Sequence, residues 1–127
     1  MGIPGTTNLL KVEIVSSILA KGTGIGQGSV AGRVKAIRQS SDLSGVEEGD
    51  ILVAVSTDAD MISAMKKAKA IVTEEAGLTS HGAIVGMSLG KPVLVGARDL
   101  LSLVADGDII TIDFTRGVIY HGHTQAK

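Results

Sequence analysis

Short apolar runs alternate with polar, turn-rich segments along most of the chain, and this pattern predicts alternating strands and helices. Residues 51–55, 70–73 and 93–95 are almost entirely apolar and short, which is typical of strands buried on both faces of a sheet. Alternation over residues 30–37 predicts a further strand. Residues 109–113 and 118–120 predict a hairpin across the turn 114–117.

Two segments with helical spacing lie between these strands. Asp58 can cap a helix over residues 61–69, whose apolar face would contain Met61, Ile62, Met65 and Ala68. A second helix is predicted over residues 80–89, with Ile84, Val85 and Leu89 facing a core. Residues 98–104 predict a helical turn. The pattern therefore indicates an α/β fold with a mixed sheet and short helices.

The amino-terminal part is harder to interpret. Residues 9–15 predict a strand, and 16–20 could continue as strand or helix. Glycines then recur at positions 22, 24, 26, 28 and 32 and superficially offer a dinucleotide-binding loop, but no helical pattern follows them. We therefore expect residues 21–32 to be a flexible linker that leads into the strand at 30–37.

Composition excludes several classes of function. The 127 residues include 44% apolar residues, one Phe, one Tyr and no Trp, so the expected core is aliphatic and stacking platforms for single-stranded nucleic acid are lacking. A net charge of -1 provides no basic surface for nucleic acid or membrane. No apolar run is long enough to span a membrane, and no secretory signal precedes the domain, so a cytoplasmic location is expected. Cysteine chemistry is excluded because there is no cysteine.

Candidate chemistry centres on His81, at the start of the second predicted helix. Gly77 permits a sharp turn after the preceding strand, and Thr79 or Ser80 is a suitable N-cap. The backbone N–H groups of a helix start favour anions, so Thr79, Ser80, His81 and Gly82 form a candidate phosphate-binding site. The imidazole could act as a nucleophile, or His81 could be a polar residue without chemistry.

The sequence Thr79-Ser80-His81, with Ala83-Ile84-Val85 and residues 89–96, resembles the phosphohistidine swivelling (mobile) domain of phosphoenolpyruvate (PEP)-utilising enzymes. The resemblance implies a swivelling β/β/α fold. It also implies His81 as the candidate catalytic residue, which would accept a phosphoryl group and carry it between active sites. The sequence departs from the family pattern in three places: Ala76-Gly77 replaces a Gly-Gly pair, Gly82 follows the histidine where the family has a small non-glycine residue, and Gly86-Met87 replaces an alanine–arginine pair. The missing arginine removes a cation for phosphate.

The opening residues 2–12, with the sequence Gly-Thr-Thr-Asn at 5–8, resemble the last strand of the C-terminal domain of pyruvate kinases. Some bacterial pyruvate kinases continue beyond it into an extra domain that resembles the mobile domain. This order implies that residues 1–20 are that last strand plus a linker, and that residues 21–127 are the mobile domain. The cut strand would then be disordered or paired with another molecule.

The two resemblances together imply an appended domain of a pyruvate kinase that is itself non-catalytic and contributes subunit contacts, stability or regulation. Its partners would be the remainder of the enzyme and neighbouring subunits. No cofactor is expected in this domain, since Mg²⁺ and K⁺ would bind the catalytic part. A phosphohistidine carrier acting through His81, or a module that senses a phosphorylated metabolite, is the alternative function.

Two other sets of residues are weaker candidates. Glu74 and Glu75 could orient the His81 ring, but we interpret them as solvated turn residues because carboxylates would repel a phosphate. Asp113, His121 and His123 could suggest a metal site, yet their spacing fixes no third ligand near a chain end. We therefore predict no metal site there.

Overall fold

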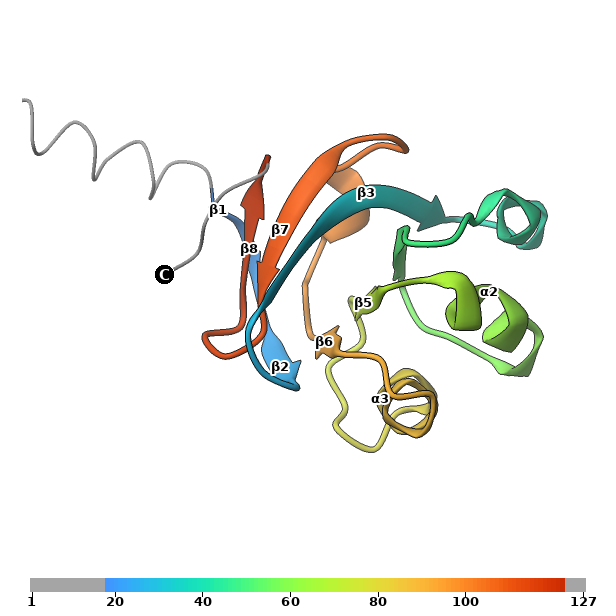
Figure 1. The fold of residues 1–127 in the computed structure, drawn as a ribbon, viewed down its shortest axis with the longest axis horizontal. Helices are drawn as coiled ribbons and strands as arrows, with labels where there is room; N and C mark the ends of the chain where they lie inside the picture. Colours follow the sequence, from blue (N-terminus) through green and yellow to red (C-terminus); the bar gives the residue numbers. More distant parts are fainter. Residues whose placement is uncertain (1–17, 123–127) are drawn as a thin grey trace, which may run out of the picture.

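A computed structural model describes residues 18–122 as one strongly curved mixed sheet flanked by short helices (Figure 1). The sheet order is β1-β8-β7-β3-β4-β5-β6-β2. Its strands are β1 Ile18–Lys21, β2 Thr23–Ile25, β3 Ser29–Ile37, β4 Ile51–Ala54, β5 Ala70–Thr73, β6 Val93–Val95, β7 Ile109–Asp113 and β8 Val118–His121. The helices are α2 Ile62–Lys67 and α3 His81–Ser88, with 3₁₀ helices η1 Ser40–Gly45, η2 Ala59–Met61 and η3 Leu100–Ser102.

The sheet has a parallel half and an antiparallel half, which confirms the predicted mixed sheet. Strands β3, β4, β5 and β6 run parallel to one another, whereas β7, β8 and β1 continue from β3 in antiparallel fashion. The strands predicted from β3 onward and both predicted helices are present, while η1 was not predicted. In the part of the chain that is described, no helix has the length and apolarity that a membrane crossing requires.

The apolar core lies on both faces of the parallel strands, as their continuous apolar sequences predict. Along β4, Ile51 and Val53 contribute to a cluster enclosed by the curved sheet, which also contains Phe114. Leu52 and Ala54 point the other way, into a second cluster beneath α2 and α3. All four β4 side chains are 0–1% exposed.

The segment containing β1 and β2 closes the sheet. β1 pairs with β8 at one end of the strand order and β2 pairs with β6 at the other, yet only Gly22 separates these two strands in sequence. Gly22 donates its N–H to the carbonyl of Gly117 at 2.8 Å. The flexible linker expected over residues 21–32 is therefore wrong, because these glycines allow the backbone to cross tightly packed neighbours.

Gly24 shows most clearly how closely two backbone segments approach each other. A Cβ atom at this position would lie against the backbone carbonyl group of Phe114, and one at Gly117, whose φ is 69°, would lie against the carbonyl oxygen of Gly22. Neither site has room for a side chain. The repeated glycines allow these strands to cross at close distance. They do not form a dinucleotide-binding loop, because strand β3 rather than a helix follows them directly.

Only the end of the segment 1–20 falls within the described part of the chain. Residues 1–17 lie outside the described residues. Ile18 to Ala20 form part of β1, which settles the choice between strand and helix for them. β1 runs through the position between residues 20 and 21 where the domain boundary was expected, and it pairs within this domain's own sheet.

Asp106 connects the parallel half of the sheet to the turn before β7. One carboxylate oxygen accepts the Ala36 N–H at 2.7 Å, and the other accepts from the Lys35 ammonium group at 3.0 Å. The Ala36 hydrogen bond, and secondarily Lys35, lower the pKa of Asp106 below its ordinary value. The turn over residues 105–108 is therefore fixed by a side chain as well as by its backbone.

Candidate functional site

The candidate site lies at the carboxyl edge of the parallel strands, where open α/β sheets commonly bind ligands. Thr57 lies in the connection that follows β4, and His81 begins the helix that follows β5. Since β4 and β5 are adjacent and parallel, their following segments meet at this edge. The topology thus brings together two residues that are 24 positions apart in sequence.

His81 is half-buried, and its ring is held by a hydrogen bond to Thr57. The Thr57 hydroxyl oxygen lies 2.7 Å from His81 Nδ1, and the Thr57 residue is only 8% exposed. Which atom donates depends on the tautomer of the ring. A partner on Nδ1 fixes the ring orientation, so the chemistry available to His81 belongs to its other nitrogen, Nε2.

The start of α3 has the capping that its sequence predicts. Ser80 is the N-cap, and its hydroxyl accepts the Ala83 N–H at 3.4 Å. Thr79 precedes the cap and is exposed. At the other end, Gly90 has φ 73° and donates its N–H to the carbonyl of Met87, which ends the helix as predicted. His81 therefore lies in the first turn of α3, where it was predicted.

The small residues of α3 face the sheet, which corrects the prediction that Ile84 faces a core. Gly82, Ala83 and Gly86 are buried, while Ile84 is 49% exposed. A Cβ atom at Gly86 would collide with the Val93 side chain. The helix packs so close to β6 that Gly86 has no room for a side chain, whereas Val85 and Leu89 are partly buried against the core cluster, as predicted.

Gly82, which departs from the family pattern, lies against the hydrogen-bonded pair. A Cβ atom there would lie 3.2 Å from Thr57 Oγ1 and 3.2 Å from Thr73 Cγ2. Both contacts are closer than ordinary packing. Glycine at this position therefore leaves Thr57 undisturbed in its contact with His81.

The two glutamates before the turn have different surroundings. Glu75 is exposed, as predicted for a solvated turn residue. For Glu74 that prediction is wrong, because its carboxylate accepts the backbone N–H of Leu101 at 2.8 Å and the residue is half-buried. Glu74 thus anchors the η3 turn to the end of β5.

Three large apolar side chains of α3 and of the turn before it are exposed. Leu78, Ile84 and Met87 are 56%, 49% and 51% exposed. Met87 occupies the position where the family pattern has arginine, so no cation is supplied from that turn of α3. Exposed apolar side chains grouped around one helix are typical of a contact surface rather than of a phosphate-binding site.

The residues Asp113, His121 and His123 were the candidates for a metal site. Within residues 18–122, no three His, Asp or Glu side chains are placed to hold a metal ion. Asp113 is buried and its carboxylate accepts the Arg116 N–H at 3.0 Å, which is a turn contact. His123 lies outside the described residues.

Thr57 was missed by our sequence analysis. A signal was present, because the carboxyl ends of adjacent buried strands converge, and Thr57 closely follows the run 51–55. What the sequence could not show was that β4 and β5 are neighbours. That adjacency depends on the order of strands in the complete sheet.

Replacing Thr57 with valine should change the tautomer populations of His81. The substitution keeps the shape of the side chain and removes the partner of Nδ1, so we expect a loss of about 1 kcal/mol in unfolding free energy and altered ring ¹⁵N chemical shifts. Two-dimensional NMR of the ring nitrogens measures the second effect. Thr57→Ser, which keeps the hydroxyl, is the matched control, and unchanged ring shifts in Thr57→Val would contradict this role.

The chain matches known proteins over most of its length. It is 49% identical over 122 residues to the pyruvate kinase of Lactobacillus delbrueckii subsp. bulgaricus, a match that covers 95% of this chain and 21% of that protein. The pyruvate kinase of Geobacillus stearothermophilus is 49% identical over 97% of the chain and 21% of its own length. A probable phosphoenolpyruvate synthase of Archaeoglobus fulgidus is 44% identical over 91% of the chain and 15% of its length.

The chain thus spans about a fifth of the length of the curated pyruvate kinases that it matches, and the match falls in their C-terminal part. Among solved structures, Enzyme I is 29% identical, with a TM-score of 0.55 over 65% of this chain and 34% of that chain. Aconitase X of Thermococcus kodakaraensis is 22% identical, with a TM-score of 0.60 over 82% of this chain and 98% of its own, and it shares the fold alone.

A family model described as "PEP-utilising enzyme, mobile domain" matches residues 46–117. The match includes every parallel strand after β3, the whole of α3, and both members of the Thr57–His81 pair. The resemblance inferred from the Thr79-Ser80-His81 motif is confirmed. This chain belongs to the family of PEP-utilising enzyme mobile domains.

Proposed function

We propose that this chain is the appended C-terminal domain of a pyruvate kinase and that the domain is itself non-catalytic. The observation that carries the proposal is the 49% identity to bacterial pyruvate kinases across 95–97% of the chain. The domain would contribute subunit contacts, stability or regulation to an enzyme that converts PEP and ADP to pyruvate and ATP.

The surroundings of His81 support a role without phosphoryl transfer. Transfer develops negative charge on three oxygens, and positioned cations usually stabilise that charge. Here α3 carries Ile84 and Met87 in the turns that follow the histidine, and both are about half exposed. Such a surface is suited to packing against another part of a larger enzyme.

The remainder of the pyruvate kinase and its neighbouring subunits are the partners in this proposal. Mg²⁺ and K⁺ would bind the catalytic part rather than this domain. Phosphate or a phosphorylated metabolite would bind weakly at Thr79, Ser80, His81 and Gly82, where a helix begins and backbone N–H groups favour an anion. An NMR titration with phosphate would detect this binding as shifts of the amide signals of these residues.

The alternative function, a phosphohistidine carrier, makes a different prediction about PEP. In that reaction the phosphorus–oxygen bond of PEP breaks, a phosphorus–nitrogen bond forms at His81, and the released enolate takes up a proton to give pyruvate. We expect no such transfer to this chain. The test incubates it with labelled PEP and a PEP-utilising enzyme whose own mobile domain has been removed, followed by assay for an acid-labile, base-stable adduct.

Two controls make the result decisive. The partner enzyme's own mobile domain, added separately, must become labelled, which shows that the assay is competent. Label on this chain should be no greater than on His81→Ala. Stoichiometric label that disappears in His81→Ala would overturn the proposal in favour of the carrier. In the intact kinase, His81→Ala should leave turnover within about twofold of the unmodified enzyme.

A further inference from the structure

The longest stretch of the sequence without a charged residue lies at the surface of the domain. Residues 76–90 contain no Asp, Glu, Lys or Arg, although at the chain's average of 20% a stretch of this length would contain about three. Eight of these residues are exposed and three are buried, so burial in the core does not explain the absence of charge. Charged residues are depleted at the centres of protein interfaces, and methionine is enriched there. We call the exposed part of residues 76–90 the α3 face.

The α3 face contains a row of side chains along the helix. His81, Ile84 and Met87 are spaced by three residues, so they follow one ridge of the helix surface. Ile84 and Met87 are 49% and 51% exposed, and Leu78 in the turn before the helix is 56% exposed. The small residues of α3 pack against the sheet on the other side, which leaves this ridge directed outward.

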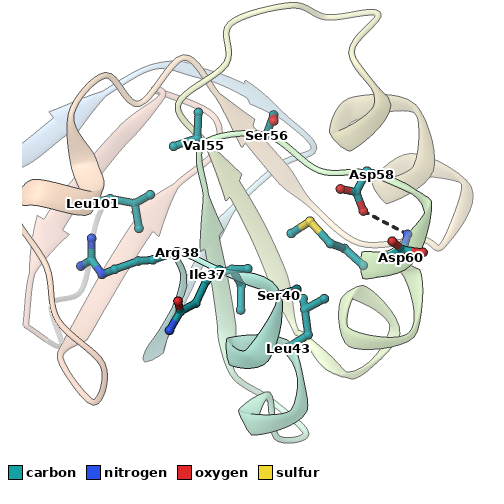
Figure 2. Close-up of a pocket in the computed structure, with 11 residues that line it drawn as sticks. Ile37, Arg38, Ser40, Leu43, Val55, Ser56, Asp58, Asp60 and Leu101 are labelled. Atoms are coloured by element: carbon teal, nitrogen blue, oxygen red, sulfur yellow. Dashed lines mark hydrogen bonds between the residues drawn. The ribbon is translucent and has the colours of Figure 1, made fainter.

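Other exposed apolar side chains of the described residues lie among charged ones. Val55 lines a pocket whose walls also contain Arg38 and Asp58 (Figure 2). Ile109 pairs with Arg33 where β7 meets β3. Single apolar side chains in polar surroundings are common on protein surfaces and require no partner. The α3 face differs from them because its exposed apolar side chains are grouped in a segment without charge.

The size of the α3 face indicates what kind of partner covers it. A stable interface between separate proteins uses about 20–30 residues a side. Eight residues of the stretch 76–90 are exposed, so isolated chains are not expected to associate through them. A contact of this size is stable when its partner is already held nearby, because the effective concentration is then high. The partner therefore belongs to the same assembly.

The position of the α3 face selects a neighbouring subunit within that assembly. The chain matches the C-terminal part of pyruvate kinases and covers 21% of their length, so the rest of such an enzyme is joined to the domain through the start of β1. α3 lies on the far side of the domain from the start of β1 (Figure 1). Two compact bodies joined at one point contact each other near that point. The α3 face is therefore directed away from its own subunit.

We propose that the α3 face docks on an uncharged, apolar surface of a neighbouring pyruvate kinase subunit. Such docking rests on the proposed function, because it requires the domain to be appended to a pyruvate kinase, and it specifies which part of the domain makes the subunit contact. Ile84 and Met87 would be removed from water, which is favourable, and no charge would be buried without a partner. His81, at the end of the same row, would be shielded from PEP.

Met87 is a probe of this contact, because its side chain is exposed whereas Met61 and Met65 are 5% and 0% exposed. Hydrogen peroxide should oxidise Met87 readily in the isolated chain and at least about tenfold more slowly in the assembled kinase, because oxidation follows exposure of the thioether. Mass spectrometry of the digested protein measures both rates. Met61 and Met65 should resist oxidation in both samples. Equal oxidation rates of Met87 in the two samples would overturn the proposal.

One pair of variants tests whether the protection of Met87 comes from docking of the α3 face. Ile84→Glu places a charge in the row and should raise the oxidation rate of Met87 in the assembled kinase toward the rate in the isolated chain. Ile109→Glu is the matched control, since Ile109 is 40% exposed and lies outside the α3 face. It should leave Met87 protected. Protection that survives Ile84→Glu, or that is lost equally in Ile109→Glu, would contradict docking through this face.

A photocrosslinking residue, p-benzoylphenylalanine, in place of Ile84 identifies the partner. Irradiation of the assembled kinase should give a product with the mass of two chains on a denaturing gel. Cross-linking confined to one chain would show that the α3 face contacts its own subunit, and the proposal would be wrong. The PEP-labelling test fails separately: label on His81 would overturn the non-catalytic role, whereas an unprotected Met87 without label would overturn the subunit contact alone.

Discussion

Replacing Gly24 with alanine is expected to lower the unfolding free energy by about 3 kcal/mol or more, and to prevent folding if the domain is only marginally stable. The added Cβ would overlap the carbonyl group of Phe114, with its carbon at 2.6 Å and the Phe114 Cα at 2.8 Å. These are backbone atoms of another segment, so no side-chain rotation can relieve the overlap. β2 would have to move away from the turn after β7.

Urea denaturation followed by circular dichroism measures this effect. Gly77→Ala is the matched control, because a Cβ there would make only ordinary contacts at 3.6–3.7 Å with Ser80. We expect that control to change stability by no more than about 0.5 kcal/mol. A Gly24→Ala protein as stable as Gly77→Ala would mean that β2 does not cross the Phe114 turn as described.

Replacing Phe114 with alanine should destabilise the domain by about 3–5 kcal/mol. Phe114 is the one phenylalanine in the sequence, and it is 1% exposed within the cluster enclosed by the curved sheet. Strands on several sides surround it, so the structure can collapse only partly into the space that the ring leaves. The loss therefore includes a cavity term as well as the transfer of the side chain.

Phe114→Leu separates these two contributions. It keeps an apolar side chain and most of the volume, so we expect a loss of about 1–2 kcal/mol in the same urea experiment. Equal losses for Leu and Ala would show that the aromatic shape matters more than the filled volume. A loss below about 1 kcal/mol for Phe114→Ala would contradict the tight enclosure of the ring.

Much of the fold could be predicted because local patterns and tertiary structure agree. The runs at β4, β5 and β6 are apolar on both faces, and both faces are buried. The capping signal of α3 is likewise local, so the start of the helix was predicted from Thr79 or Ser80. The candidate site was predicted around His81 for the same reason.

The features that the sequence analysis predicted wrongly or missed depend on contacts between segments that are far apart in sequence. Nothing near Gly22 or Gly24 in sequence reveals that they cross the turn after β7. Ile84 follows the helical spacing of a core residue, but α3 packs its small residues against the sheet and leaves Ile84 exposed. Thr57 closely follows a buried run, but its contact with His81 becomes evident only once β4 is known to lie beside β5.

The closure of the sheet by β1 has a consequence for synthesis of the chain on the ribosome. Ile18 pairs with Tyr120, and Lys21 pairs with Val118, so β1 is made early and obtains its partner only after β8 has been made. The parallel strands can associate before then, while β1 and β7 each still lack the neighbour that β8 provides. Closing so long a loop is a slow step. The nascent domain therefore passes through a stage with unpaired strand edges, and it depends on that final closure to avoid association between growing chains.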